Sequence, residues 1–232
     1  MDVVAASIGL GLTLPLFPIV AAVIKLDSPG PVFFRQRRAK TLMSPQPGDR
    51  PGRVRCEEFD ILKFRTMGTD AEKRTGAVFA EKDDPRVTRV GRFLRRSRLD
   101  ELPQLWNVLK GDMSLIGPRP ERPEILRDLA LAIPYFEERM HDVKPGLTGL
   151  AQVRLGYTGA IPEDDPLHAL KRTLENPFGV EGAEGALADD LRAKLLWDMA
   201  YSAALERFST FVRTELSILL RTPVVMLRRS GQ

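Results

Sequence analysis

The chain has 232 residues, a formal net charge of +4 and a sequence pI of about 9.4. This length suffices to bury a core, and one main domain is expected. The positive charge is too weak to indicate nucleic acid by itself, but it suits an anionic membrane surface or phosphorylated substrates. The single cysteine, Cys56, excludes an internal disulfide, and with only two histidines beside it a zinc site is disfavoured.

The first element is an apolar segment from Val3 to Ile24 that contains no charged residue. At about 1.5 Å of rise per residue, a straight helix of this length would nearly cross a hydrocarbon core. Pro15 and Pro18 predict a bend, because each removes a backbone donor. A spanning helix, a re-entrant helix–break–helix and a soluble core helix stay open. A signal peptide is disfavoured because Asp2, and no basic residue, precedes the run. The basic residues that follow place the bulk of the chain on the cytoplasmic side.

A β-hairpin is expected next. The turn residues 27–31 end the helical segment, and Val32–Phe34 reads as a strand that runs into a basic cluster. A Pro- and Gly-rich loop over 39–53 precedes a returning strand from Phe59 to Met67. Alternation along this strand puts one set of side chains on a common face: Phe59, Ile61, Lys63 and Arg65.

Two helical units are predicted around the middle of the chain. The first is an amphipathic helix in which Arg86, Arg89, Arg92 and Arg95 recur every third residue, and six arginines lie between Arg86 and Arg98. A solvated charged face is its plain interpretation, and a neighbouring membrane segment shifts this towards contact with phosphates or lipid headgroups. The second unit runs from Ser97 to Gly111, where glycine is a natural C-terminal stop. Its apolar residues are expected to share one face: Leu102, Leu105, Trp106 and Leu109.

The remaining elements are less regular. A helix is predicted over 121–139 with a boundary at Pro134, then a turn over 144–149 and a short strand at Ala151–Val153. Residues 158–190 read as loop. The last helical region covers 191–227 and is interrupted near Pro223. Its apolar stripe is expected to pack on the core rather than lie in a membrane interface: Leu205, Phe208, Val212, Leu216 and Leu219.

The adjacent carboxylates Asp100 and Glu101 are the first candidates for chemistry. Helix electrostatics alone can explain them, because acidic residues are favoured in the first turn of a helix. Arginines stand directly before them, however, and free N–H groups at a helix start bind phosphate oxygens. In phosphoryl transfer, one carboxylate could act as nucleophile and the other as an oxygen ligand for Mg²⁺.

Three basic residues extend this candidate site. Arg119 lies between two prolines, so its guanidinium stands on a stiff backbone that suits a bidentate grip on phosphate. Lys63 and Arg65 are expected to add positive charge to the same pocket. The sequence contains no Gly-rich phosphate loop, Ser-His-Asp order or metal-binding histidine pair, so the common enzyme signatures are absent.

Four sequence blocks stand out in chain order: Lys25–Gln36, Lys63–Met67, Leu99–Pro120 and Lys144–Val153. Together they resemble the bacterial sugar transferases, also called monotopic phosphoglycosyl transferases, and the third block matches almost without a break. The resemblance covers residues 2 to about 157. It implies an α+β, mostly helical fold with a small β-hairpin and amphipathic interfacial helices. Residues 1–26 would form a re-entrant membrane helix and 27–232 a compact cytoplasmic catalytic domain, with 158–190 as a loop-rich insertion.

The resemblance also implies an activity. Such enzymes transfer a phospho-sugar from a nucleotide sugar, here expected to be a UDP-sugar, to undecaprenyl or another polyprenyl phosphate. They act at the cytoplasmic face of the bacterial inner membrane and start the assembly of exopolysaccharide, lipopolysaccharide or other glycoconjugates. Membrane lipids are therefore expected partners, nucleic acid is not, and a homodimer stays open.

Residue roles follow from the same resemblance. Asp100 falls on the nucleophile, which forms a phosphosugar intermediate in a ping-pong reaction and releases UMP. Glu101 falls on a Mg²⁺ ligand and Arg119 on the arginine that holds phosphate. The other residues expected to bind substrate or phosphate are Lys63, Arg65, Arg98 and Gln152.

The sequence departs from the family pattern at several positions, and two other functions stay open. Leu14-Pro15 stands where Ser-Pro is usual, Leu150 replaces a frequent Trp, and Glu215 stands where Asp is usual. One alternative is a non-catalytic, membrane-attached assembly module with the same fold. The other is a nucleic-acid binder that uses the arginines of 86–98, which the apolar N-terminus disfavours. The sequence does not identify the sugar.

Overall fold

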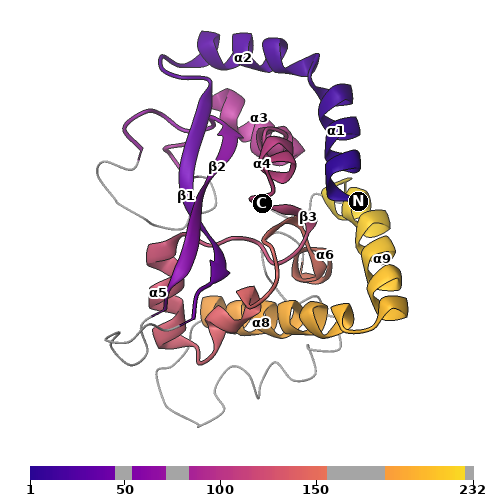
Figure 1. Ribbon diagram of the computed structural model, residues 1–232. Coiled ribbons are helices and arrows are strands. Elements are labelled where there is room, and N and C mark those ends of the chain that lie inside the picture. Colours follow the sequence, from indigo (N-terminus) through magenta and orange to yellow (C-terminus); the bar gives the residue numbers. More distant parts are fainter. Residues whose placement is uncertain (45–53, 72–83, 156–185, 228–232) are drawn as a thin grey trace.

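The computed structural model describes residues 1–44, 54–71, 84–155 and 186–227 of the chain (Figure 1). Two helices, α1 (Asp2–Thr13) and α2 (Leu16–Asp27), form the N-terminal segment and meet at an angle of 60°. Pro15 caps α2 and Pro18 lies in its first turn, where a missing donor breaks no helical bond. The predicted bend is therefore confirmed. Within the described residues no single helix is long and apolar enough to cross a membrane, whereas this bent pair meets both conditions together.

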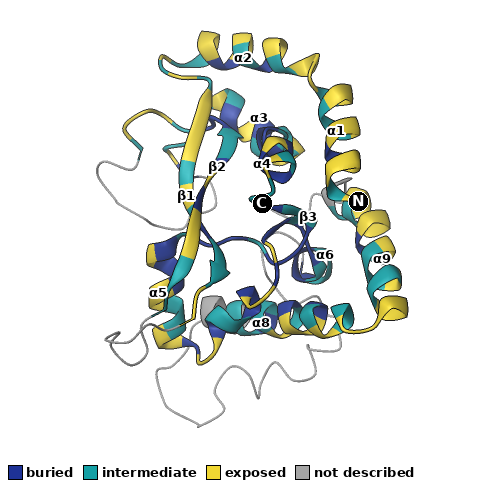
Figure 2. Ribbon diagram, viewed as in Figure 1, coloured by how far each residue is buried: buried dark blue, intermediate teal, exposed yellow. Residues whose placement is uncertain are grey.

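The N-terminal pair leaves much of its apolar surface outside the core. Ala6 of α1 is fully buried beside Leu105 and Val108, and Val20 and Ile24 of α2 enter a second cluster. The outward sides of both helices are exposed (Figure 2). Their exposed large apolar residues are Val3, Val4, Ile8, Leu12, Leu14, Leu16, Ile19, Val23 and Leu26.

The predicted antiparallel hairpin is confirmed, with strands β1 (Phe33–Leu42) and β2 (Cys56–Phe64). The prediction of a loop from residue 39 is wrong for 39–42, which belong to β1. Ala39 is fully buried against Leu126 and Phe136, and its N–H donates to the carbonyl of Glu121, so the strand is held there. The rest of that predicted loop, 45–53, lies outside the described residues.

The returning strand ends earlier than predicted. It stops at Phe64, and Met67 instead forms an isolated bridge with Val87, just before the next helix. That helix, α3 (Arg89–Ser97), is capped by Thr88, whose hydroxyl accepts from the Gly91 N–H at 2.9 Å. A Cβ on Gly91 would lie 2.0 Å from the carbonyl oxygen of Thr66, so the close seat of α3 beside the end of β2 requires glycine.

The predicted helix from Ser97 to Gly111 is divided. Arg98 adopts the left-handed conformation (φ 58°) and separates α3 from a single 3₁₀ turn, η1 (Leu99–Glu101). Pro103 then caps α4 (Gln104–Lys110), and Gly111 (φ 79°) ends it as expected. The expected common face is only partly formed, because Leu105 is buried whereas Trp106 is 52% exposed.

A small parallel pair of strands follows, β3 (Ser114–Ile116) and β4 (Gly146–Thr148). The predicted strand at 151–153 is wrong, because those residues belong to α6 (Leu150–Leu155), where Ala151, Gln152 and Leu155 are buried on one helical face. The strand of this region is β4, which lies just before α6 in the chain. A Cβ on Gly146 would lie 2.1 Å from the nitrogen of Gly117, so glycine permits this close pairing.

Between β3 and β4 lie α5 (Pro123–Ala132) and the 3₁₀ helix η2 (Phe136–Met140). The predicted helix over 121–139 is therefore two elements, and the break falls at Pro134 as expected. Phe136 and Met140 of η2 pack with Leu126 of α5 and with Ala39 of β1. This cluster joins the hairpin to the rest of the chain.

The C-terminal region forms α8 (Ala186–Leu205) and α9 (Phe208–Leu227), which follow two edges of the molecule (Figure 1). The interruption lies at 206–207 rather than at Pro223, which stays inside α9. The turn lets Ile218 of α9 pack against Tyr201 of α8. Of the predicted loop 158–190, only 186–190 is described, and it is helical.

The apolar stripe predicted to pack on the core is mostly exposed. Phe208 is 80% and Leu216 53% exposed, whereas Ile218 is 1% exposed and takes the core position. The prediction is wrong because α9 buries a different face from the one that the stripe marks. The observed fold is mostly helical with a small hairpin, which confirms the predicted α+β class.

Candidate active site

Asp100 and Glu101 lie on η1, between the end of α3 and the start of α4. The left-handed turn at Arg98 ends α3 and leads directly into η1. The N–H of Glu101 donates to the Arg98 carbonyl at 3.2 Å. Both carboxylates are buried, with Asp100 6% and Glu101 4% exposed. Burial of two adjacent acids is costly unless cations offset their charge.

Three cations offset the charge of Glu101. Its Oε1 accepts from Lys63 Nζ of β2 at 3.1 Å and from Arg119 Nη2 at 2.5 Å. Arg98 Nη1 lies 4.0 Å from the same oxygen. The structure therefore brings Lys63, Arg98 and Arg119, which were all predicted from the sequence, to Glu101. Lys63 and Arg119 come from parts of the chain well separated from η1.

The two carboxyl groups have opposite acidities. Burial alone would raise the pKa of Glu101, but the charges of Arg119 and Lys63 hold that pKa well below its usual range. For Asp100, burial and then the neighbouring charge of Glu101 raise the pKa to about 6. Positive charge from Lys63, Arg98 and Arg95 opposes this shift. Glu101 is thus a fixed anion, and Asp100 is an acid that ionises near neutral pH.

Asp100 keeps one oxygen without a hydrogen bond. Its Oδ1 is buried and has no hydrogen-bond partner among the described residues. Because hydrogen bonds to a carboxylate stabilise its charge and reduce its basicity, the carboxylate of Asp100 is left more basic than that of Glu101. The surrounding cations would lower the repulsion that an approaching phosphate meets.

Arg65 is not part of this cluster. Its guanidinium donates to the carbonyl of Pro29 at 2.5 Å and to that of Ser28 at 2.8 Å. These bonds hold the turn after α2 against the end of β2, so Lys63 and Arg65 do not meet at Glu101. A substrate contact by Arg65 stays a prediction.

Gln152 is buried on α6. Neither its Oε1 nor its Nε2 has a hydrogen-bond partner among the described residues. It lies near Gly149, where an added Cβ would stand 2.6 Å from its Oε1. Its role in substrate binding also stays a prediction.

Two arginines near the site are missing from the prediction. Arg38 of β1 donates to the Pro120 carbonyl at 3.0 Å, and burial lowers its pKa to about 10. Arg95 of α3 donates through Nε to the Thr66 hydroxyl at 2.9 Å, and its charge acts on Asp100. Alternation along β1 is the sequence signal for Arg38, because it puts Arg38 on the face opposite to that of Arg35 and Arg37. In the structure Arg35 and Arg37 are exposed, whereas Arg38 is half-buried.

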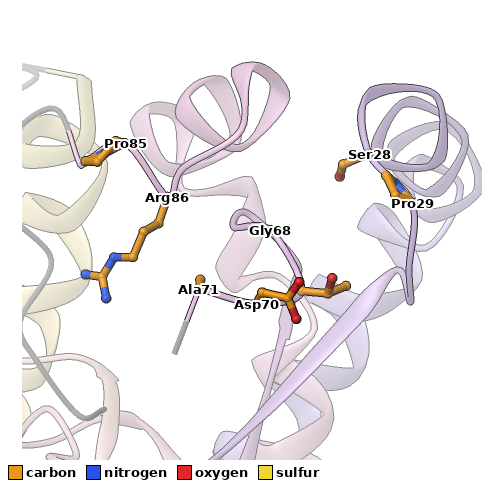
Figure 3. Close-up of a pocket in the computed structure, with 8 residues that line it drawn as sticks. Ser28, Pro29, Gly68, Asp70, Ala71, Pro85 and Arg86 are labelled. Atoms are coloured by element: carbon orange, nitrogen blue, oxygen red, sulfur yellow. The ribbon is translucent and has the colours of Figure 1, made fainter. Parts of the chain in front are cut away.

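A pocket of about 340 Å³ opens beside the turn that follows α2 (Figure 3). Asp70 points towards Ser28 and Pro29 across it, whereas the Arg86 guanidinium extends away from them. The carboxylates of η1 are not part of its described lining, which consists of Ser28, Pro29, Gly68, Thr69, Asp70, Ala71, Pro85 and Arg86. Arg65 binds the carbonyls of two of these residues, Ser28 and Pro29, but the pocket does not contain the carboxylates of η1.

The described residues include no group of three or more His, Cys, Asp or Glu side chains that could hold a metal ion. Mg²⁺ is commonly bound by one or two carboxylates together with substrate phosphates, so a complete protein cage is not required. Asp100 Oδ1 accepts no hydrogen bond among the described residues, and Glu101 Oε2 has a long contact of 3.5 Å with Arg119 Nη1. Glu101 Oε2 is therefore a carboxylate oxygen with spare acceptor capacity, which suits such an ion.

Comparison with known proteins gives a consistent family match. The sequence pattern described as bacterial sugar transferase matches residues 1–229. The chain is 48% identical over 157 residues to a UDP-N-acetylgalactosamine-undecaprenyl-phosphate N-acetylgalactosaminephosphotransferase of Aeromonas hydrophila, covering 68% of this chain and 34% of the relative. It is 42% identical over 174 residues to a UDP-glucose:undecaprenyl-phosphate glucose-1-phosphate transferase of Xanthomonas campestris pv. campestris. These residues cover 75% of this chain and 32% of the relative.

A third relative is closer in length. The exopolysaccharide production protein PSS of Rhizobium leguminosarum bv. phaseoli is 40% identical over 169 residues, which cover 72% of this chain and 76% of the relative. By contrast, the matched region spans about a third of the Aeromonas and Xanthomonas proteins.

Proposed function

Because the chain belongs to the bacterial sugar transferase family, we propose that it transfers a phospho-sugar from a nucleotide sugar to a polyprenyl phosphate. One observation carries the proposal. Asp100 is a buried carboxylate with an unbonded oxygen, and it adjoins a glutamate held by lysine and arginine. This arrangement supplies a nucleophile and the positive charge that phosphoryl transfer needs.

The reaction has two displacement steps. A carboxylate oxygen of Asp100 attacks the β-phosphorus of the donor, and the bond to the bridging oxygen breaks. For a UDP-sugar, UMP leaves with that oxygen and its electron pair. An oxygen of the polyprenyl phosphate then attacks the phosphorus of the acyl phosphate (the mixed anhydride of Asp100 and the phosphosugar), and the carboxylate is released unchanged. Asp100 must be ionised to begin, and a pKa of about 6 provides this above neutral pH.

Arg119 and Lys63 would stabilise the charge of the transferring phosphate. In the structure both point at Glu101 Oε1, so Glu101 holds them in place before a substrate arrives. A preorganised cation costs no rearrangement in the transition state, which is why such groups are effective catalysts. Arg98 and Arg95 add positive charge around Asp100.

Mg²⁺ would be held by Glu101 Oε2 together with donor phosphate oxygens, which leaves Asp100 Oδ1 for the attack. When bound, it supplies further positive charge at the diphosphate. We therefore keep Mg²⁺ as the expected cofactor and Glu101 as a ligand.

We also propose that the chain is seated in the cytoplasmic face of a bacterial inner membrane through α1 and α2. The bend of 60° and the exposed apolar faces of both helices support a re-entrant hairpin that enters and leaves on one side. Such a seat would bring the site to the depth at which the phosphate of a lipid acceptor lies. A reporter fused to the N-terminus tests the topology: a periplasmic signal would refute it.

The donor class is tested by a panel. The Aeromonas and Xanthomonas relatives are named for UDP-N-acetylgalactosamine and UDP-glucose, so these two sugars lead the series. The purified chain in detergent is mixed with each donor, undecaprenyl phosphate and Mg²⁺, and UMP release is measured. UMP release with at least one donor, abolished in Asp100→Asn, is expected. No release with any donor would favour the non-catalytic assembly module.

A further inference from the structure

Four largely buried charged side chains form a network around the segment that carries Arg119. The members are Arg139 of η2, Lys194 and Asp198 of α8, and Glu121. Arg139 has no exposed surface, and Asp198 is 1% exposed. The two cations and two anions balance in charge, yet none of the four takes part in the proposed reaction. A buried ionic network is costly to assemble and is weak evidence for stability alone, so its placement suggests another role.

Arg139 uses all three nitrogens of its guanidinium. Nε donates to Asp198 Oδ2 at 2.7 Å, and Nη1 lies 3.5 Å from Glu121 Oε1. Nη2 donates to the main-chain carbonyl of Arg119 at 2.9 Å. Lys194 also binds Glu121. A planar fork with fixed donor directions makes this set of contacts, which the single point charge of a lysine cannot.

The same segment is held from the hairpin side. Arg38 donates to the Pro120 carbonyl at 3.0 Å, and the Ala39 N–H donates to the Glu121 carbonyl at 2.9 Å. Three successive carbonyls, of residues 119–121, therefore each accept a bond from outside the segment. Pro120 also restricts the backbone of Arg119 to extended conformations. The main chain of Arg119 is thus fixed on both sides, and its side chain reaches Glu101 from a rigid base.

We propose that Arg139 and Asp198 are positioning residues that fix the backbone of Arg119 and so hold its guanidinium at Glu101. Asp198 orients Arg139, and Arg139 holds the Arg119 carbonyl. Helix α8 thereby contributes to the phosphate-binding arginine without touching the carboxylates of η1. The inference rests on the proposed function for its catalytic consequence.

A mutant cycle tests the catalytic consequence. Asp198→Asn and Arg139→Lys are each made in the wild-type chain and in Arg119→Ala. In the wild-type background we expect kcat/KM for the donor to fall by about 10- to 100-fold, mainly through kcat, because a misplaced catalytic group loses rate. In the Arg119→Ala background we expect less than about a twofold further loss, because no guanidinium remains to be positioned. Asp198→Glu, which keeps the charge, should recover part of the rate.

Met140→Ala is the matched control. Met140 is buried next to Arg139, and its thioether has no donor for the Arg119 carbonyl. Its truncation should therefore lower thermal stability and have the same small effect on kcat/KM in both backgrounds. Equal losses from Asp198→Asn in both backgrounds would overturn the proposal, because they would indicate a general loss of structure. If Arg139→Lys does not fold, the Asp198→Asn cycle decides.

A second readout does not depend on turnover. In ¹⁵N-labelled protein, the Nε–Hε signal of Arg119 is assigned by its loss in Arg119→Lys. We expect Asp198→Asn to shift this signal and speed its exchange with water, and Met140→Ala to leave it unchanged. An unchanged Arg119 signal in Asp198→Asn would overturn the proposal. If the wild-type chain shows no transfer with any donor, the proposed function fails, whereas the positioning role is still decided by this signal.

Discussion

Replacing Asp100 with asparagine should stabilise the protein while it abolishes transfer. Burial and the charge of Glu101 raise the pKa of Asp100 from 3.8 to about 6. A group whose pKa is raised on folding binds its proton more tightly in the folded state, so its ionisation destabilises the fold as pH rises through that value. Two pKa units at about 1.4 kcal/mol each give a penalty of about 3 kcal/mol at pH 8. Asparagine has the shape of the neutral acid and cannot ionise, so the variant does not carry this penalty.

The assay is thermal unfolding of Asp100→Asn and wild type between pH 4 and 8. At pH 8 the variant should unfold roughly 6 to 12 °C higher, since about 1 kcal/mol shifts the melting temperature of a chain this size by roughly 2 to 4 °C. The difference should shrink as pH falls through 6 and vanish near 4. Asp128→Asn, which changes an exposed carboxylate of α5, is the control and should stay within about 0.5 kcal/mol of wild type at every pH. A variant that is less stable than wild type at pH 8, or equally shifted at all pH values, would refute the reasoning.

Three further predictions concern the same site and its supports. The donor kcat/KM should rise with pH, reach half of its plateau near pH 6 and level off about one pH unit higher, because only ionised Asp100 attacks. A flat pH–rate profile between 5 and 8 would contradict this. Arg119→Lys should lower kcat/KM by at least about tenfold without unfolding the chain, because one ammonium cannot repeat the contact that the two Nη atoms of Arg119 make with Glu101. Wild-type kcat/KM in steady-state kinetics of this variant would contradict the prediction. Gly91→Ala should lower the melting temperature by several degrees, because its Cβ would stand 2.0 Å from the Thr66 carbonyl; an unchanged melting temperature would show that α3 can shift freely.

The fold was predictable where its signals are local. The bend at Pro15, the hairpin and the C-terminal stop at Gly111 each follow from residues close together in the sequence. The parallel pair β3–β4 was missed because each strand has only three residues, and their pairing joins positions 114 and 146. Such short strands carry no alternation, and non-local pairing leaves no local pattern.

The candidate site shows the same division. Asp100, Glu101 and Arg119 stand out in the sequence through adjacency and flanking prolines, and the structure brings Arg119 to Glu101. The separation of α3 from η1 was not predictable, because the left-handed turn at Arg98 uses an arginine in a conformation that favours glycine. Nor could the sequence show that Arg139 binds Asp198, since 59 residues separate them and each alone resembles a surface charge.

Detection of the phosphosugar bound to Asp100 as an acyl phosphate would test the proposed mechanism most directly. The purified chain is incubated with its UDP-sugar and Mg²⁺ without a lipid acceptor, quenched in acid, digested and analysed by mass spectrometry. We predict that the peptide containing Asp100 gains the mass of one sugar phosphate, and that addition of undecaprenyl phosphate before the quench removes it. An active enzyme whose Asp100 peptide never carries that mass would contradict a nucleophilic role for Asp100.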